Sequence, residues 1–580
     1  MRRMKILFDE GPLGGGTLFD APVRLIRADG PDQVPEALDQ IARAQAEGHW
    51  LAGCFSYELG YCLTERLAPL LPRERRVPLI LMGVFGGCRA PAPDAPAPVF
   101  LSPPCPAWDS ARYGVAFDRV RDYIAAGDCY QINLTFPQTL RATGTPDALY
   151  AALRRVQPVR HGALVDLGGP VILSRSPELF FAVDADGMIE TRPMKGTVAR
   201  GATPGADRAA RDWLGASEKN RAENLMIVDL LRNDLSRISR VGSVRVPRLF
   251  EVESYATVHQ MTSTVRAQLL PGTNLPAILH ALFPCGSVTG APKIRAMEII
   301  RELEPAPRDA YCGAIGWVAP DGRMSFNVAI RTLTLHDDGE AVLNVGGGVV
   351  HDSTGDAEYA EALLKAGFAR LPGSDLFGPD LQVIETLGSD GQGGFVRLNL
   401  HLDRLRASCA RLGLPLDMGA VRAALADVPR DGPRRVRLAV DAGGRVALTH
   451  APCPPVSAPW RLRIAAERLD SADPWLGVKT THRAIYDRAR AALPEGVDEL
   501  LFLNERDEVC EGTITNVFAR LDGQLCTPPL ACGVLPGVLR RDLIDRGEAV
   551  ERILTPTDLT RAKALFVGNS LRGLIPAVMA

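Results

Sequence analysis

The chain has 580 residues, 46% of them hydrophobic and 23% charged, a composition typical of globular proteins. This length predicts roughly two to four domains. Its 66 basic and 68 acidic residues leave a formal net charge of −2, so no strong field favours nucleic acid or an anionic membrane as a partner. The sequence shows no signal peptide and no apolar run of the roughly 20 residues that a membrane-spanning helix needs. We therefore expect a cytoplasmic protein that binds neither nucleic acid nor membranes.

Cysteine and lysine usage narrows the chemistry further. The 12 cysteines include no C-x-x-C pair, so we expect buried thiols rather than a zinc site or a disulfide framework. Because arginine supplies most of the basic residues, each lysine is a candidate for a place where a titratable amine is needed. The lysines are Lys5, Lys195, Lys219, Lys293, Lys365, Lys479 and Lys563.

Two breaks divide the chain. A proline-rich connector over residues 88–108 ends an N-terminal layer (1–108), and the segment 372–380 is a linker between a core over 109–371 and a second block over 381–580. In the first block we expect strands near 162–167, 187–194 and 341–350, and helices over about 220–235 and 356–370. The second block opens with strand, turn, strand and helix from residue 381. We expect an α/β fold for the first block and an α+β fold for the second.

Lys195 is the first candidate for catalysis. It lies in ETRPMKGTVAR, in a strand that we expect to end at Gly196, with Glu178 upstream as a possible partner carboxylate. An amine presented to a cleft and removed from water becomes a nucleophile. The alternative is a surface lysine beside a turn.

Acidic residues on two predicted helices are candidate metal ligands. Glu223 lies on a helix whose apolar face includes Leu225, and Glu358, Glu361 and Lys365 share one face of the later helix. Spacing alone favours an exposed Glu361–Lys365 pair of little energy. The functional alternative is a carboxylate set with Glu223 for Mg²⁺.

The segment GSVTGAPKIRAMEII places a glycine-rich turn before a helix that starts after Pro292. Converging backbone N–H groups there favour an anion. The segment lacks the Walker pattern, so a phosphate is less favoured than a carboxylate. Arg331 and the glycine run 346–348 suit a carboxylate as well.

Eight motifs of the first block, in this order, resemble the chorismate-utilising enzymes: SPELF, RPMKGT, EKNRAENLMIVDLLRNDL, ESYATVHQMTSTV, GSVTGAPKIRAMEII, CGAIGW, FNVAIRTL and GGGVVHDSTGDAEYAE. The resemblance implies a large α/β sandwich that binds chorismate and Mg²⁺. It implies Glu223 and Glu361 as metal ligands, with Glu358 close by, and Glu178 as a catalytic acid/base. It further implies substrate contacts from Arg331, Lys365, Gly347, Gly348, His259 and Thr289.

Lys195 distinguishes the branches of that family. Anthranilate synthases have alanine at this position, whereas aminodeoxychorismate synthases have lysine in a PIKGT-like motif. The resemblance implies that the Lys195 amine attacks the ring as the C4 hydroxyl leaves, and that ammonia then adds at C4 and releases the lysine. A Leu-Leu-Glu-Ser-like run of the tryptophan-regulated relatives is absent, so we do not expect regulation by tryptophan.

The second block contains Lys479 just before a predicted helix, and an isolated lysine is more often structural. Its surroundings favour function, because Glu511 stands beside glycine and threonines and GVLPGVLRRDL opens a helix with a glycine turn. A lysine, an acid and a phosphate cup are the parts that pyridoxal phosphate needs.

These motifs resemble the fold-type IV pyridoxal-phosphate enzymes. The resemblance implies that Lys479 carries the cofactor and moves protons, and that Glu511 pairs with the pyridinium. It implies phosphate contacts from Arg404 and Ser570 and from the backbone of Val538 and Leu539. The family includes aminodeoxychorismate lyase and also branched-chain and D-amino-acid aminotransferases.

The fusion of the two blocks favours production of 4-aminobenzoate, a folate precursor, by a synthase step followed by a lyase step. No glutaminase segment is found, so we expect a separate glutamine amidotransferase subunit as the ammonia source. We also expect a homodimer through 381–580. Two alternatives stay open. In the first, the chain is a chorismate-dependent synthase, which includes the anthranilate and isochorismate types, fused to an aminotransferase. In the second, the second block is a non-catalytic dimerisation module.

Overall fold

The computed structural model describes residues 4–93, 97–254, 258–371, 381–412, 414–441, 443–453 and 459–580. The chain forms two compact units. The N-terminal unit comprises Met1–Asp94, Pro103–Arg141 and Tyr150–Leu371, and the C-terminal unit comprises Ala95–Ser102, Ala142–Leu149 and Pro372–Ala580. The predicted linker 372–380 lies outside the described residues.

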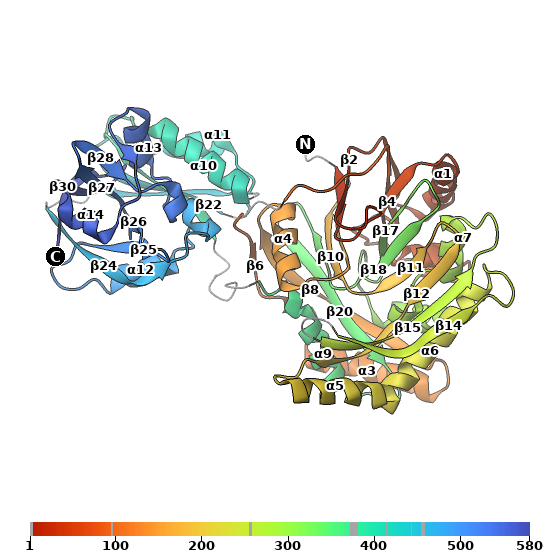
Figure 1. The fold of residues 1–580 in the computed structure, drawn as a ribbon. Coiled ribbons are helices and arrows are strands. Elements are labelled where there is room, and N and C mark those ends of the chain that lie inside the picture. The colour runs from red at the N-terminus through yellow and green to blue at the C-terminus, as the bar shows by residue number, and fades with distance from the viewer. Residues whose placement is uncertain are drawn as a thin grey trace. The chain divides into compact units, whose positions relative to one another are not determined.

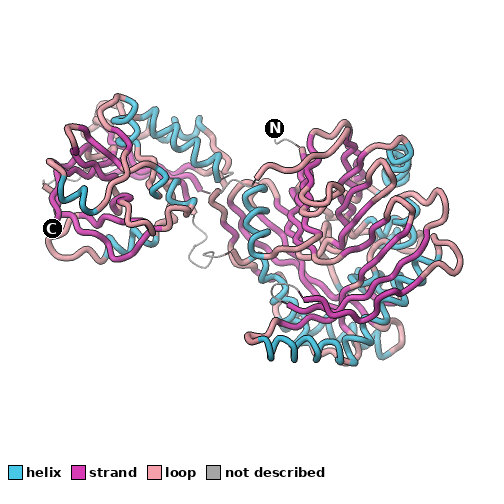
Figure 2. The backbone as a smooth tube through the Cα atoms, viewed as in Figure 1, coloured by secondary structure: helices cyan, strands magenta, loops and turns pink. Residues whose placement is uncertain are grey.

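Two large sheets dominate the N-terminal unit (Figures 1 and 2). The first has the order β16 (Gly290–Ala291), β8 (Gln131–Thr143), β20 (Glu340–Val349), β19 (Thr332–Leu335), β10 (Val171–Ser176), β9 (His161–Asp166), β1 (Lys5–Phe8) and β2 (Thr17–Asp20), with β7 (Cys105–Pro106) also paired to β8. The second has the order β13 (Met194–Ala199), β15 (Val258–Gln268), β12 (Met188–Arg192), β11 (Leu179–Val183), β18 (Met324–Val328), β17 (Ala314–Val318), β4 (Trp50–Phe55), β5 (Ile80–Phe85) and β3 (Arg24–Ala28), with β14 (Arg245–Ser254) also paired to β15.

The two sheets pack face to face, because successive side chains of a strand point to opposite faces. In β17, Ile315 and Trp317 join a core cluster that includes residues of β1, β2, β9 and β10 of the first sheet. Ala314 and Val318 of the same strand join the other cluster, which is shared with helices. The predicted two-sheet α/β sandwich is confirmed.

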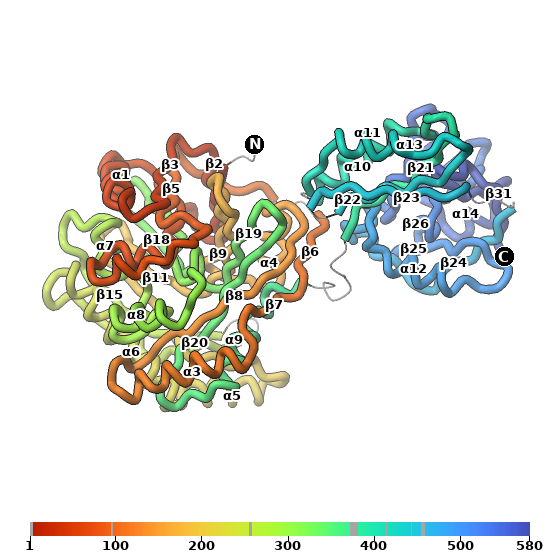
Figure 3. The backbone as a smooth tube through the Cα atoms, turned by 180° about the vertical axis from the view of Figure 1, so that it is seen from behind, coloured from red at the N-terminus to blue at the C-terminus, as the bar shows by residue number. Residues whose placement is uncertain are grey.

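Helices cover the outer faces of this sandwich. They are α1 (Val34–Ala46), α2 (Leu59–Cys62), α3 (Ser110–Ala125), α4 (Pro146–Val156), α5 (Pro204–Ala216), α6 (Glu218–Ser236), α7 (Leu275–Leu282), α8 (Lys293–Leu303) and α9 (Gly355–Lys365). α9 packs against β20 and α3, and β8 and β20 run side by side when seen from behind (Figure 3). The predicted helix near 220–235 is α6, but Leu225 is 43% exposed, because the buried face follows Ile227, Val228 and Leu231 at helical spacing.

The C-terminal unit contains two smaller sheets. One has the order β21 (Gln382–Ser389), β22 (Arg434–Asp441) and β23 (Val446–Pro452). The other has the order β26 (Val509–Gly512), β25 (Glu499–Asn504), β24 (Trp460–Leu469), β31 (Gly573–Met579), β30 (Ala564–Asn569), β27 (Asn516–Leu521), β28 (Gln524–Thr527) and β29 (Val550–Glu551). The helices are α10 (Leu398–Leu412), α11 (Met418–Ala426), α12 (Ala484–Ala491), α13 (Val538–Asp545) and α14 (Pro556–Arg561). The second strand expected after β21 is only a bridge between Ser389 and Phe395.

The structure also bears on two expectations from composition. All 12 cysteines are free, and Cys105 and Cys453 are exposed while most of the others are buried. Among the described residues, no helix combines the length and the apolar character needed to cross a membrane.

Candidate active sites

Lys195 lies at an irregularity of an edge strand. The pairing of β13 with β15 shifts register between Met194 and Thr197, and Gly196 between them has a φ of +85°. The strand therefore bulges at Gly196 and continues to Ala199, which corrects the expected end of the strand, because glycine adopts this left-handed conformation without steric cost.

The amine of Lys195 lies against the glycine run of β20. A Cβ placed on Gly348 would stand 3.1 Å from Lys195 Nζ and 2.9 Å from Gln131 Nε2, so only glycine leaves both groups in place. Burial lowers the pKa of Lys195, and the charge of Lys365 lowers it further against the opposite effects of Glu223 and Glu178. A larger fraction of the amine is thus unprotonated than for an exposed lysine.

Glu178 is a buried carboxyl between β10 and β11. Burial raises its pKa to about 7, while a hydrogen bond from Ser287 and the charge of Lys195 act in the opposite direction. Ser287 Oγ donates to Glu178 Oε1 at 2.7 Å from the turn that precedes β16. A carboxyl with such a pKa can give and accept a proton near neutral pH.

The face of α9 meets the same glycine run. Lys365 Nζ donates to the carbonyl of Gly346 at 2.9 Å and pairs with Glu361 at 3.0 Å. A Cβ on Gly347 would stand 3.0 Å from Glu358 Oε2. Glu358 is buried and accepts a hydrogen bond from Ser353. The exposed pair expected from spacing is therefore formed, since the Glu361 side chain is 59% exposed, and Lys365 also contacts the glycine run.

Glu223 of α6 interacts electrostatically with Lys195 and with the carboxylates of α9. Burial raises its pKa, and the charges of Glu358 and Glu361 raise it further, whereas Lys195 and Lys219 lower it. The described residues contain no cluster of three or more His, Cys, Asp or Glu side chains arranged around a metal ion. Mg²⁺ in proteins is often bound by only one or two carboxylates with water completing its shell, so mutually repelling carboxylates such as Glu223 and Glu361 fit such an ion.

The remaining predicted substrate contacts differ in how many of their polar atoms are already hydrogen-bonded within the protein. The Arg331 guanidinium, whose pKa is lowered by burial, makes no hydrogen bond or ion pair with any residue that the structure describes. Both ring nitrogens of His259 are engaged, by Ser254 and by Asp207. The Thr289 hydroxyl donates to the carbonyls of Cys285 and Gly286. Arg331 thus has donors that no described residue occupies, while the roles of His259 and Thr289 stay predictions.

A cavity of about 1080 Å³ lies in the C-terminal unit, and Lys479, Glu511, Arg404 and Ser570 are among its lining residues. The Lys479 backbone is held by β21, because its carbonyl accepts from the Ile384 N–H at 2.9 Å. Its Nζ makes no hydrogen bond within the described residues. Burial, with the charges of Arg404 and Arg483, lowers the pKa of Lys479 to about 8.

Glu511 stands on β26 in the same cavity. It accepts hydrogen bonds from the Tyr486 hydroxyl at 2.7 Å and from the Leu535 N–H at 3.1 Å. Burial raises its pKa to about 7. A second buried carboxylate, Glu499, accepts from Thr513 and Thr515 and so holds the loop that follows Glu511.

The cavity lining also includes a helix start that is suited to an anion. Gly537 caps α13, whose first-turn N–H groups have no acceptor within the helix. Val538 lines the cavity, whereas the Leu539 side chain packs in a core cluster and leaves only its backbone for a ligand. A lysine whose amine is not hydrogen-bonded to any described residue, an acid and a helix N-terminus line one cavity, so the residues present fit pyridoxal phosphate.

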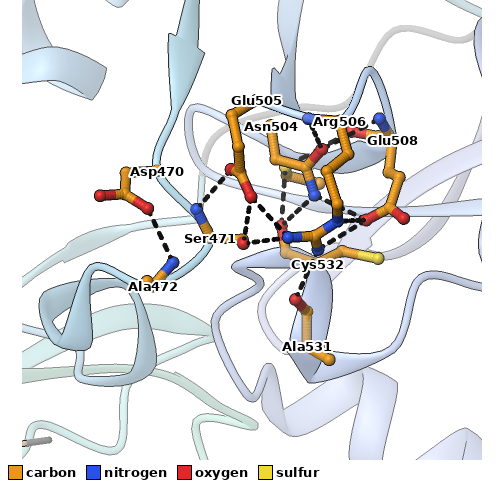
Figure 4. A network of polar contacts seen from close by, with 10 residues as sticks. Asp470, Ser471, Ala472, Asn504, Glu505, Arg506, Glu508, Ala531 and Cys532 are labelled. Carbon is orange, nitrogen blue, oxygen red and sulfur yellow. Dashed lines mark hydrogen bonds and ion pairs between the residues drawn. The ribbon is translucent and has the colours of Figure 1, made fainter.

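A polar network holds the segment that leads to Lys479 (Figure 4). Glu505 accepts from the backbone N–H and the hydroxyl of Ser471, and Arg506 donates to Ser471 Oγ at 2.6 Å and to the Ala531 carbonyl at 3.0 Å. Figure 4 shows Arg506 between these two segments. The turn between β25 and β26 thereby ties two loops that border the cavity.

With both sites described, comparison with known proteins becomes informative. Residues 87–370 match the chorismate binding enzymes, and residues 382–579 match the class IV amino-transferases. The two parts of the chain thus match two different families, and the domain names used from here on are taken from these matches. We refer below to the chorismate-binding domain and the aminotransferase domain.

The chorismate-binding domain has curated relatives. The chain is 46% identical over 256 residues to "Aminodeoxychorismate synthase component 1" of Escherichia coli. The matched region covers 44% of this chain and 56% of that protein. It is 47% identical over 257 residues to "Aminodeoxychorismate synthase" of Streptomyces pristinaespiralis, which covers 44% of this chain and 35% of that protein. The chain spans 35% to 58% of the length of the first curated relatives that it matches.

Among solved structures, anthranilate synthase component I of Streptococcus pneumoniae matches with a TM-score of 0.53 and 28% identity, over 61% of this chain and 92% of that one. This likeness supports the two-sheet fold of the chorismate-binding domain.

Sequence reasoning missed several residues that the fold brings to these sites. Ser287 was visible only as part of a turn. Gln131, whose buried amide atoms have no hydrogen-bond partner in the part of the chain that the structure describes, carried no signal. In the aminotransferase domain, Glu385 and His401 lie beside the predicted phosphate contacts. His401 stands three residues before Arg404 on α10, and this spacing on one helix face was the available signal.

Proposed function

We propose that this chain makes 4-aminobenzoate from chorismate and ammonia in two steps, amination in the chorismate-binding domain and pyruvate elimination in the aminotransferase domain. The observation that carries the proposal is the Lys195 amine, which lies against Gly348 with a lowered pKa and with Glu178 and Glu223 nearby. The homology with aminodeoxychorismate synthases supports the same first product.

In the first step, the unprotonated Lys195 Nζ forms a bond to the conjugated ring as the bond to the C4 hydroxyl breaks. Glu178, with a pKa near 7, gives its proton to that hydroxyl, which leaves as water. Ammonia then forms its bond at C4 while the bond to Lys195 breaks. Covalent catalysis by an amine suits this sequence, because the amine can itself be expelled.

Groups of α6, α9, β20 and the connection between β18 and β19 would position the substrate for this attack. The free Arg331 guanidinium and Lys365, together with the backbone of Gly347 and Gly348, would hold a carboxylate. Glu223 and Glu361, with Glu358 close by, would hold Mg²⁺, which supplies charge neutralisation for the carboxylates of the substrate.

In the second step, pyridoxal phosphate bound in the cavity supplies an electron sink for the loss of a ring proton. Lys479 would carry the cofactor and move that proton at Nζ, for which its pKa of about 8 is suited. Glu511 would pair with the pyridinium, and Arg404, Ser570 and the first turn of α13 would bind the phosphate.

Ammonia would come from a glutamine amidotransferase subunit, because the relatives that match this domain include proteins described as component 1. The predicted homodimer through 381–580 is part of the proposal and is tested by sedimentation of the full chain.

The deciding experiment is mass-resolved product analysis with chorismate, Mg²⁺, ammonium and pyridoxal phosphate. We expect 4-aminobenzoate from the wild type, aminodeoxychorismate from Lys479→Ala, and neither from Lys195→Ala. Lys563→Ala, an exposed lysine that lines neither proposed site, is the matched control and should keep both steps. Anthranilate or isochorismate as the product would refute the proposal for the first domain.

A second candidate concerns the aminotransferase domain alone, because its family is described by amino-group transfer. Amino-group exchange between an amino acid and a 2-oxo acid, without pyruvate release from aminodeoxychorismate, would favour this alternative. An unchanged absorption spectrum on addition of pyridoxal phosphate would instead favour a non-catalytic module.

A further inference from the structure

A buried chain of hydrogen bonds links three elements at the cavity that His401 and Ser570 help to line. Glu385 of β21 accepts from His401 Nδ1 at 2.6 Å, and His401 Nε2 lies 2.8 Å from the hydroxyl of Ser570 in the turn between β30 and β31. Glu385 and His401 are each 1% exposed. Neither residue belongs to the contacts proposed above, yet they meet the residue proposed to bind phosphate.

The ionisation of Glu385 determines which nitrogen of His401 bears a hydrogen. Burial opposes ionisation of Glu385, but two hydrogen bonds from Arg404 and one from His401 lower its pKa to about 2. A carboxylate can only accept hydrogen bonds, so Nδ1 of His401 must be the donor. Nε2 is therefore the ring nitrogen of His401 that can gain or lose a proton.

The state of Nε2 then determines what Ser570 offers to a ligand. If His401 is neutral, Nε2 accepts the Ser570 proton, and the hydroxyl presents only lone pairs to the cavity. If His401 is cationic, Nε2 donates to Ser570 Oγ, and the hydroxyl proton turns toward the ligand. An anionic phosphate needs donors, so it favours the second state.

We propose that His401 takes up one proton at Nε2 when a phosphate group binds at Ser570, and thereby turns the Ser570 hydroxyl into a donor to that group. His401 is a positioning residue in this role, because it acts on the ligand through Ser570. The inference rests on the proposed cofactor site and adds a proton to its binding equilibrium.

The charges around His401 agree with this coupling. On its own helix, Arg404 offsets Glu385 of β21, and the thiol of Cys409, its pKa raised to about 11 by burial, is neutral. Arg397 is paired with Asp542 of α13 at 2.6 Å. Lys479, on the segment beside β21, adds a positive charge, and this charge disfavours a second positive charge on His401. A bound dianion supplies the negative charge that offsets the added proton.

Binding should therefore be pH-dependent with a defined sign. Below the titration of His401 in the free protein, the proton is already present and affinity for the anion is constant. Above it, binding must draw a proton from solution, so affinity falls by up to about tenfold per pH unit until His401 also loses its proton in the loaded state.

The test is nuclear magnetic resonance of the full chain labelled with ¹³C-histidine, titrated in pH with inorganic sulfate, with pyridoxal phosphate and with neither. Sulfate stays dianionic over this range, so any proton taken up belongs to the protein. The resonance that disappears in His401→Gln is assigned to His401 among the nine histidines. We expect its titration midpoint to rise by about one pH unit with either anion.

Two variants at Ser570 keep the inference testable if His401→Gln does not fold. Ser570→Ala should remove most of the anion-induced shift, whereas Ser570→Thr, which keeps the hydroxyl, should retain it. A His401 resonance that titrates alike with and without pyridoxal phosphate, while the cofactor develops its visible absorption, would overturn the inference and leave the proposed function intact. Absence of that absorption, with no response to sulfate, would overturn both.

Discussion

Removal of the Ser287 hydroxyl should move the pH dependence of the first step. Ser287 Oγ donates to Glu178 Oε1 at 2.7 Å in a buried site, and this bond favours the ionised form of Glu178. A hydrogen bond to a charged group contributes about 1.5–3 kcal/mol, and 1.36 kcal/mol corresponds to one pH unit. In Ser287→Ala, Glu178 should therefore keep its proton to a pH higher by about one to two units.

The sign of this effect follows from the role of Glu178 as an acid. With a pKa of about 7, Glu178 is protonated below that pH, and its contribution to the rate falls as pH rises further. The descending limb in Ser287→Ala should lie at higher pH, although the absolute rate is lower because the carboxyl is less well oriented. Ser287→Thr retains a hydroxyl and is the matched control.

The assay is kcat/KM for chorismate, with formation of aminodeoxychorismate followed from pH 6 to pH 9. The rate of Ser287→Ala is divided by that of Ser287→Thr at each pH, so the titration of ammonium cancels. This ratio should increase by about tenfold across the limb, which follows from a displacement of one pH unit. A ratio that is constant over the range would refute the assignment of Glu178 as the acid of this step.

Three further changes test other parts of the two domains. Glu361→Ala should remove Mg²⁺-dependent turnover from the first step only, and an unchanged Mg²⁺ titration would exclude Glu361 as a ligand. Glu511→Gln should retain the visible absorption of bound cofactor but lower kcat of pyruvate release by roughly 10- to 100-fold, because a neutral amide replaces the charged partner of the pyridinium and a hydrogen bond between charged groups contributes about 1.5–3 kcal/mol; an unaltered kcat would contradict its role. Phe181→Ala should destabilise the chorismate-binding domain by about 3–5 kcal/mol in denaturant unfolding, because Phe181 is fully buried and stacks on Phe326 with ring centroids 5.2 Å apart; a loss below about 1 kcal/mol would show that the core closes around the missing ring.

Local patterns determined much of this protein, because they depend on neighbours along the chain. Helical spacing predicted α6 and the shared face of Glu358, Glu361 and Lys365, and the glycine before Val538 marked the start of α13. The ordered motifs likewise indicated both families. Each of these signals lies within a segment of one helix or one turn, where backbone geometry alone sets which side chains share a face.

Contacts between distant segments were decided only by the tertiary structure. Ser287 meets Glu178 across 109 residues, and Ser570 meets His401 across 169, through sheet order and helix packing that no local spacing encodes. Gly196 illustrates the same limit within a strand: its sequence is compatible with an end or a bulge, and only the register against β15 selects the bulge that carries Lys195 toward Gly348. The sequence thus determined which polar groups are present, and tertiary packing decided which of them are hydrogen-bonded to each other.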